Sequence, residues 1–376
     1  VPGADRDLFD LAAANKACVL VVADKRVDRD WRALGAVGVI DADFDRQAVL
    51  EQLVRYATPV GRIDDAAPLK VAPSGTPKES DGRLVVVTGG SGAGTSTVAM
   101  AVAQELGDAP EFEDTTLLAD LALRADQGML HDAKDVVPGL QELVDSHRNG
   151  APSGRELQSM VFKPHDRGYH LLLGLRRHQD WAVLRQRALQ SSLDSLLSAY
   201  EVVVADVEAD VEGEEETGSV EVEERNMLAR SSLLQADLVL VVGVPTTKGL
   251  NDLVRVVHDL ARFGVPGRLV IPVLNRTPRS VRSRSSIGGA LSTLLQPVSS
   301  GLCSAVHLPH KQRIEDVLRE GTRLPASFAR PIGQAVRAGL ERDFRNPRSE
   351  RTQPLRITPG SVGQLGADAW NQDGAA

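Results

Sequence analysis

The sequence predicts an α/β protein whose core is a mostly parallel, doubly wound sheet. Apolar runs of strand length recur between residues 84 and 308 without alternating polar residues, which is typical of strands buried on both faces. Helical patterns separate these runs, as crossover connections between parallel strands require. One run also passes through a glycine-rich turn directly into an apolar helix, at residues 84–106. Together these observations favour a sheet covered by helices on both faces.

Composition and charge exclude several classes of protein. Of the 376 residues, 42% are hydrophobic and 25% are charged, which allows one large core and smaller pieces. The net charge of -8 argues against nucleic acid as a partner, so no specific nucleic-acid binding is expected. Cys18 and Cys303 have no disulfide or zinc-site spacing, which indicates a reducing cytoplasm. No apolar run approaches the roughly 20 residues that span a bilayer, so any membrane contact should be peripheral, at the inner face.

The leader, residues 1–62, predicts a small receiver-like α/β unit. Its helices are expected at Leu8 to Ala14 and Arg46 to Tyr56, and its strands at Ala17 to Ala23 and Val37 to Ile40. A complete receiver fold takes roughly 110 to 120 residues, more than this segment offers. The unit is therefore truncated, fused to the main sheet, or completed by a partner chain.

Composition also marks the remaining domain boundaries. Proline, glycine and polar residues dominate residues 63–82, which predicts a linker. The large α/β domain is expected at residues 83–345. Residues 346–376 are rich in proline, glycine, serine, arginine and glutamine, which predicts a disordered tail.

The most informative segment of the large domain is a glycine-rich loop between a strand and a helix. It follows the apolar run Leu84 to Thr88 and consists of Gly89, Gly90, Ser91, Gly92, Ala93, Gly94, Thr95, Ser96 and Thr97. Such a loop offers backbone N–H groups and a helix N-terminus to phosphate, and its hydroxyl groups suit Mg²⁺. Gly89, Gly94 and Ser96 fit the phosphate-loop pattern G-x-x-x-x-G-K-[ST], but Thr95 replaces the lysine.

The missing lysine decides the chemistry expected of this loop. A charge-assisted contact is worth about 1.5 to 3 kcal/mol, so weak ATP binding through the backbone N–H groups is expected to remain. Turnover should suffer more, because deleting a positioned charge typically costs about a hundredfold or more. A glycine-rich turn that binds no ligand is the alternative interpretation.

Further strands and helices follow the loop in regular order. The expected strands are Thr116 to Ala119, His170 to Leu173, Val202 to Ala205, Leu238 to Val242, Leu269 to Leu274 and Ser304 to Leu308. The expected helices include Leu184 to Ala199, Gly249 to Phe263 and Arg313 to Glu320. This alternation is the pattern of a parallel sheet with crossover helices.

Polar side chains end several of these strands, at the edge of the sheet where the phosphate loop is expected. Asp206 and Asp120 each close an apolar run, and Asp206 suits indirect coordination of Mg²⁺. Together with Ser96 they are the candidate Mg²⁺ ligands, although a plain strand-ending aspartate is the alternative for Asp206. Asn275 closes a later strand, and its paired donor and acceptor suit an adenine edge.

These segments resemble the MinD/ParA-type P-loop ATPases, and within them the CpaE/TadZ-like proteins of pilus assembly and secretion loci. The resemblance covers about residues 84–325, and the leader and linker also match the CpaE/TadZ layout. It rests on residues 89–99, 117–126, 173–177, 202–206, 236–242, 273–276 and 308–310. It implies ATP and Mg²⁺ binding across a homodimer, with Arg276 and Pro309 beside Asn275 among the nucleotide-binding residues. It also implies recruitment to a membrane-proximal machine through a secretion or pilus ATPase or a polar scaffold protein.

Departures from the family pattern fall on the residues that drive hydrolysis. Gly90 stands where the family has the signature lysine that reaches the partner subunit's phosphates, and Thr95 replaces the loop lysine. Ala122 replaces the second carboxylate of a D-x-D switch whose first is Asp120. Another cation could substitute for the missing groups only if the fold brings it to the γ-phosphate. The candidates are Arg124, Arg176, Arg177 and Lys248. The resemblance therefore implies a degenerate ATPase, at most weakly active, with Asp120 and Asp206 as remnants.

Charged segments and the last helical pattern each allow two interpretations. The acidic residues 206–224 predict a solvated loop, or else a docking strip or a loop that covers the nucleotide site. A basic patch is formed by Arg276, Arg279, Arg282 and Arg284. It predicts either an ordinary surface loop or a contact with anionic lipid or nucleic acid. Apolar residues recur at every fourth position in the last helical pattern, at Ile332, Val336, Leu340 and Phe344. This pattern predicts a helix that either packs on the sheet or touches a membrane.

Three functions remain open from the sequence. The first is a localisation or assembly factor for a pilus or secretion apparatus, with little or no hydrolysis. The second is a septum-placement or partition regulator of the same fold. The third is a nucleotide-free interaction scaffold in which the loop is vestigial.

Overall fold

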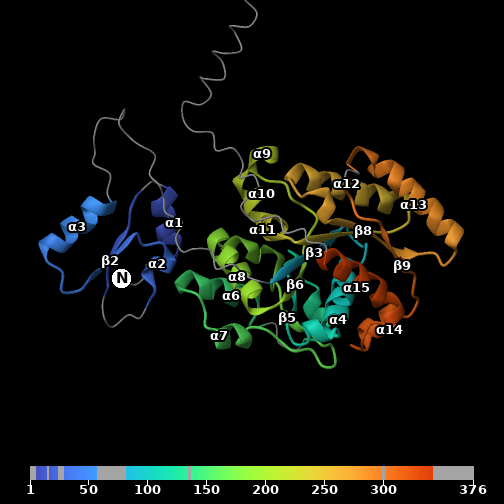
Figure 1. The fold of residues 1–376 in the computed structure, drawn as a ribbon, viewed down its shortest axis with the longest axis horizontal. Helices are drawn as coiled ribbons and strands as arrows, with labels where there is room; N and C mark the ends of the chain where they lie inside the picture. The colour runs from blue at the N-terminus through green and yellow to red at the C-terminus, as the bar shows by residue number, and fades with distance from the viewer. Residues whose placement is uncertain are drawn as a thin grey trace, which may run out of the picture. The chain divides into compact units, whose positions relative to one another are not determined.

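Seven parallel strands form the large sheet, in the order β5-β4-β6-β3-β7-β8-β9 (Figure 1). They are β3 (Arg83–Gly89), β4 (Thr116–Asp120), β5 (His170–Leu172), β6 (Val202–Asp206), β7 (Leu238–Gly243), β8 (Val270–Thr277) and β9 (Val306–Pro309). Every apolar run predicted as a strand of the large domain forms one, and the predicted α/β fold class is confirmed. The run predicted from Leu269 begins instead with a tight 3-10 turn at Gly267–Leu269, and its strand continues to Thr277.

The structure, a computed structural model, describes residues 6–14, 17–23, 29–56, 82–133, 137–298 and 301–341. The predicted linker at 63–82, apart from Gly82, lies outside the described residues. So do the predicted tail at 346–376 and Phe344 of the last helical pattern.

Helices cover both faces of the sheet because the side chains of each strand alternate between two hydrophobic cores. In β3, Leu84 and Val86 belong to one core, and Val85 and Val87 to the other. The first core is completed by α6 (Leu140–Asn149), α8 (Gln186–Ala199), α11 (Met227–Gln235), α12 (Thr247–Phe263) and α13 (Val281–Leu295). The second is completed by α4 (Thr95–Gly107), α14 (Ile314–Arg319) and α15 (Ala326–Glu341). Each fully buried valine or leucine of β3 contributes about 1.5 to 3 kcal/mol to the stability of the domain.

Helix α15 packs closely against α4. A Cβ atom at Gly333 would lie 2.4 Å from Cβ of Glu105, so only glycine permits this approach. Ile332 and Val336 on the same helix are fully buried in the second core. Their apolar stripe therefore faces the sheet, as one of the two interpretations predicts. Within the described ranges, no helix has both the length and the apolarity needed to cross a membrane.

The leader has a small sheet of its own. Strands β1 (Leu20–Ala23) and β2 (Gly38–Asp41) pair in parallel, and the helices are α1 (Arg6–Ala14), α2 (Trp31–Leu34) and α3 (Arg46–Tyr56). Phe9, Trp31 and Leu34 form its buried core. Among the described strands, β1 and β2 pair only with each other, so the alternative of fusion to the large sheet is wrong for this part of the chain.

The acidic segment after β6 differs from the predicted loop. It folds into two short helices, α9 (Glu214–Thr217) and α10 (Val220–Arg225). Acidic side chains suit the first turn of a helix, and Glu216 accepts a hydrogen bond from the backbone N–H of Gly213 at 2.8 Å. Arg225 pairs with Asp210 at 2.8 Å, which offsets part of the local negative charge. The remaining short helices of the domain are α5 (Gln127–Leu130) and α7 (Gly154–Ser159).

Candidate functional site

The predicted phosphate loop joins the end of β3 to the N-terminus of α4. Gly92 and Gly94 have φ angles of 74° and 86°, in the left-handed region where a side chain is strained. Gly94 is the N-cap residue of α4, and no side chain caps the helix. The N-terminal N–H groups of α4 and the positive end of its dipole therefore face outward from the loop, as an anion site requires.

Asn275, two residues before the end of β8, contacts this loop. Its side chain is buried, its Nδ2 donates to the carbonyl oxygen of Ala93 at 2.9 Å, and its Oδ1 accepts from the N–H of Arg276 at 2.8 Å. A Cβ atom at position 94 would lie 2.6 Å from Nδ2, so the amide and Gly94 fit each other closely. The amide predicted to read adenine thus uses one Nδ2 hydrogen and one Oδ1 lone pair within the protein.

The two strand-ending carboxylates predicted near the loop lie side by side. Asp120 of β4 and Asp206 of β6 are register partners, and both side chains are buried. Burial, with the negative charge of Asp206, raises the pKa of Asp120 well above its usual range. Burial also raises the pKa of Asp206 to about 6, although hydrogen bonds from Gln127 and Ser96 oppose that shift. The structure therefore brings Ser96, Asp120 and Asp206 to one place.

The sequence did not predict the residue that joins these groups, Gln127. It is fully buried at the start of α5, and its backbone N–H donates to Oδ2 of Asp120 at 2.8 Å. Its side-chain Nε2 donates to Oδ2 of Asp206 at 2.7 Å and to the carbonyl oxygen of Ser96 at 3.2 Å. Its Oε1 is buried and has no hydrogen-bond partner among the described residues. One side chain thus connects β6 with the phosphate loop.

The donor set around Asp206 does not fit a divalent cation in this arrangement. Mg²⁺ binds oxygen lone pairs, but an oxygen of Asp206 and the Ser96 carbonyl face the N–H groups of Gln127 instead. The Ser96 hydroxyl donates to Asp206, which leaves the lone pairs of its oxygen unused by this contact. No group of three or more His, Cys, Asp or Glu side chains within the described ranges could hold a metal ion.

Lys248 is the candidate cation that the fold brings to the phosphate loop. It lies in the first turn of α12, which Thr246 caps by accepting from the N–H of Gly249 at 3.0 Å. Lys248, Gly90 and Ser91 line one small pocket of about 90 Å³. The same pocket includes Asp252, whose Cβ would lie 3.1 Å from a Cβ at position 90. Space for a lysine side chain at position 90 is therefore restricted, and Lys248 of α12 lines the same pocket.

The other candidate cations have different surroundings. Arg176 donates to Gln141 at 2.7 Å and pairs with Glu142 at 3.1 Å, so α6 holds its guanidinium. Arg124 and Arg177 are exposed, and neither lines the pocket beside Gly90.

The remaining predicted nucleotide-binding residues lie at the ends of β8 and β9. Pro309 ends β9, where it is the register partner of Thr277. Arg276 is exposed beside it, with a φ of 56° that is unusual for a residue with a side chain. Both residues therefore lie on neighbouring strands at the carboxyl edge of the sheet, where ligands of such folds bind.

A buried polar network adjoins Gln127. His131 contacts the carbonyl oxygen of Gln127 through Nδ1 at 2.7 Å and the hydroxyl of Tyr169 through Nε2 at 2.7 Å. Arg167 donates to the Tyr169 hydroxyl at 3.4 Å and to the carbonyl oxygen of Gly321 at 2.9 Å. Scattered histidines and a lone arginine gave no sequence signal for this network, because its members meet only after the chain folds.

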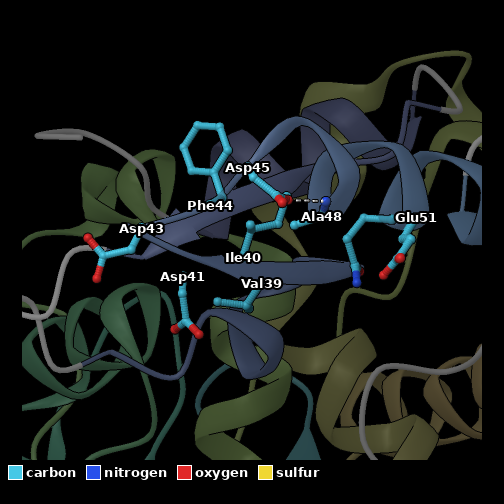
Figure 2. A pocket seen from close by; sticks show the side chains of 9 residues that line it. Val39, Ile40, Asp41, Asp43, Phe44, Asp45, Ala48 and Glu51 are labelled. Atoms are coloured by element: carbon cyan, nitrogen blue, oxygen red, sulfur yellow. Dashed lines mark hydrogen bonds between the residues drawn. The ribbon is translucent and has the colours of Figure 1, made fainter.

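A second pocket, of about 380 Å³, lies in the leader at the end of β2. Asp41, Asp43, Asp45 and Glu51 line it, and the carboxylate of Asp45 accepts from the N–H of Ala48 at 2.8 Å. Figure 2 shows the carboxylates of Asp41, Asp43 and Glu51 pointing in different directions. These acidic groups do not converge on one point, and the pocket shares no residue with the phosphate loop.

Comparison with known proteins supports the fold of the large domain. No protein-family profile and no curated protein sequence matches the chain. A ParA family ATPase from Chlorobium tepidum has a TM-score of 0.50 at 16% identity, over 69% of this chain and 95% of that protein. The cell division ATPase MinD from Pyrococcus furiosus has a TM-score of 0.50 at 18% identity, over 68% and 99%. A McdA–ATP complex from Cyanothece has a TM-score of 0.50 at 17% identity, over 69% and 96%.

These likenesses show the fold, which is that of the MinD/ParA-type P-loop ATPases. In this chain β3 and its phosphate loop lie at the centre of the sheet, and three strands extend on each side.

Proposed function

We propose that this chain binds ATP weakly in the loop Gly89 to Thr97, does not turn it over at a useful rate, and acts as a localisation or assembly factor. One observation carries the proposal: the backbone of the loop keeps an anion-binding shape, while Gly90, Thr95 and Ala122 replace the charged groups that hydrolysis needs. The McdA–ATP complex among the similar folds supports nucleotide as the ligand.

The proposal also names the apparatus that such a factor would serve. The resemblance to CpaE/TadZ-like proteins favours a pilus or secretion apparatus, with a secretion ATPase or a polar scaffold as partner. The similar fold of MinD, which is also found in a MinC:MinD cell division complex from Aquifex aeolicus, favours septum placement or partition as the second candidate. A homodimer suits both candidates. Without a lysine at position 90, its assembly should depend little on nucleotide.

Thermal unfolding with ATP, ADP or GTP tests nucleotide binding directly. Ligand at 100 times its dissociation constant should stabilise the folded chain by about 2.7 kcal/mol. If none of the three nucleotides shifts the unfolding temperature, the loop is vestigial and the chain is an interaction scaffold.

Lys248→Ala should weaken ATP binding by about tenfold, because an ammonium group beside a phosphate is worth roughly 1.5 kcal/mol. Titration with a fluorescent ATP analogue measures the change. Arg262→Ala is the matched control, since it removes the same charge from the exposed last turn of the same helix. Equal affinities for wild type and Lys248→Ala would show that Lys248 does not contact the phosphates.

Steady-state phosphate release should be at background, because the positions of both lysines and of the water-positioning carboxylate hold Gly90, Thr95 and Ala122. Thr95→Lys should strengthen ATP binding more than it raises turnover, since Ala122 still offers no carboxylate. Thr95→Met is the control for side-chain length without charge. A wild-type turnover of about 1 per second that Asp206→Ala abolishes would contradict this prediction.

A further inference from the structure

We propose that the carboxamide of Gln127 takes the place of a divalent cation beneath the phosphate loop, so that the chain binds nucleotide without Mg²⁺. The nucleotide part of this inference rests on the proposed function. The part that concerns Gln127 rests only on contacts within the chain.

Gln127 connects the elements that a cation would otherwise have to hold together. Its backbone N–H holds Asp120 at the end of β4, and its Nε2 holds Asp206 at the end of β6. The same nitrogen donates to the carbonyl oxygen of Ser96 in the first turn of α4, at 3.2 Å. Two neighbouring strands and the start of α4 are thus joined by a neutral group.

Chemistry fixes the orientation of this amide. The two atoms near Nε2, Oδ2 of Asp206 and the carbonyl oxygen of Ser96, are acceptors, and an amide oxygen turned toward them would repel both. Nε2 has two hydrogens, and these two acceptors use both of them. Oδ2 of Asp206 and the carbonyl oxygen of Ser96 are therefore directed at N–H groups and not at a cation.

The position of Gln127 is equally well defined. The side chain is fully buried, and its backbone is held by Asp120 at 2.8 Å at the first residue of α5. Because the side chain is buried and the backbone is fixed by Asp120 and by the start of α5, the Gln127 side chain has few other conformations. Binding of a cation would have to displace the amide and leave its N–H groups without partners, which is costly in a buried site.

The test compares thermal unfolding of the wild-type chain and of Gln127→Glu, each in EDTA and in Mg²⁺, without nucleotide. Glutamate has the shape of glutamine but replaces the N–H donor by an oxygen, which places a third carboxylate next to Asp120 and Asp206. We expect the wild-type unfolding temperature to be the same in EDTA and Mg²⁺. Gln127→Glu should unfold several degrees lower in EDTA, and Mg²⁺ should restore much of that loss.

Gln186→Glu is the matched control, because it adds the same charge at an exposed position at the start of α8. A Mg²⁺ response shared by this variant would reflect charge screening. Gln127→Met, which has neither donor nor added charge, should also lose stability but should gain nothing specific from Mg²⁺. A wild-type unfolding temperature that rises with Mg²⁺ and loses this rise in Asp206→Asn would overturn the inference.

Nucleotide binding is the second measurement. The affinity of wild type for a fluorescent ATP analogue should change by less than about threefold between EDTA and Mg²⁺. A gain of about tenfold or more in Mg²⁺ would also overturn the inference, while leaving the proposed function intact. Absence of binding in both buffers would refute the proposed function, and the unfolding experiment would still decide the role of Gln127.

Discussion

Replacing Gly94 with valine is expected to abolish nucleotide binding. The backbone at Gly94 has a φ of 86°, which costs a branched residue about 1 to 3 kcal/mol. A Cβ there would also approach Nδ2 of Asn275 to 2.6 Å and displace the amide that supports Ala93. The loop would lose its shape where it meets the N-terminus of α4. The stabilisation by saturating ATP, about 2.7 kcal/mol at 100 times the dissociation constant, should vanish.

Gly92→Ala separates backbone strain from the collision with Asn275. Gly92 also has a positive φ, 74°, but nothing lies within 4 Å of a Cβ placed there. This variant should keep a measurable shift with ATP, while Gly94→Val keeps its circular dichroism spectrum and loses the shift. An undiminished ATP shift in Gly94→Val would place the nucleotide at another site.

Acid should destabilise the chain through His131. Burial, together with the positive charge of Arg167, lowers the pKa of His131 to about 4 from about 6.5. The carbonyl oxygen of Gln127 only accepts, so Nδ1 of His131 must donate to it, and Nε2 is left to accept from the Tyr169 hydroxyl. A proton on Nε2 would point at the hydrogen that the Tyr169 hydroxyl donates, and it would add a positive charge beside Arg167.

The direction of the pH dependence follows from the lowered pKa. The unfolded chain takes up the proton near pH 6.5, whereas the folded chain takes it up only near pH 4, so stability falls as the pH falls between these values. The loss is about 1.4 kcal/mol per pH unit, or roughly 3 kcal/mol over the window. The raised pKa values of Asp120 and Asp206 act in the opposite direction over the same window, so the contribution of His131 is the difference between wild type and His131→Gln in denaturant unfolding at a series of pH values.

His131→Gln should remove this part of the acid sensitivity, because glutamine does not titrate. His165→Gln is the matched control, since His165 is highly exposed. If His131→Gln loses stability with falling pH as steeply as wild type does, another group is responsible.

The strands of the large domain were predictable because each is buried on both faces. An uninterrupted run such as Val202 to Ala205 identifies a strand without knowledge of its neighbours. The acidic segment was misread as a loop, because acidic composition suggests solvation. The short helices α9 and α10 instead depend on local contacts such as that between Arg225 and Asp210.

The parts of the site that could be predicted from the sequence are those formed by one continuous segment or by the ends of neighbouring strands. The phosphate loop is such a segment, and the pairing of Asp120 with Asp206 follows from two strand ends meeting at one edge. Gln127 could not be found this way, since a neutral glutamine after a strand matches no pattern. Its partner Asp206 lies far along the chain. Asn275 was noticed as a polar strand end, but its contact with Ala93 required the fold.

The central position of β3 has a consequence for synthesis of the protein. This strand leaves the ribosome before either of its neighbours, because Arg83 pairs with Val202 of β6 and Val85 pairs with Leu238 of β7. At about 5 to 20 residues per second, the roughly 150 residues between β3 and β7 take about 7 to 30 seconds to appear. Throughout that interval the nascent chain carries an apolar strand with an unpaired edge, a surface prone to aggregation. The yield of folded protein should therefore depend on how well chaperones at the ribosome shield residues 83–89.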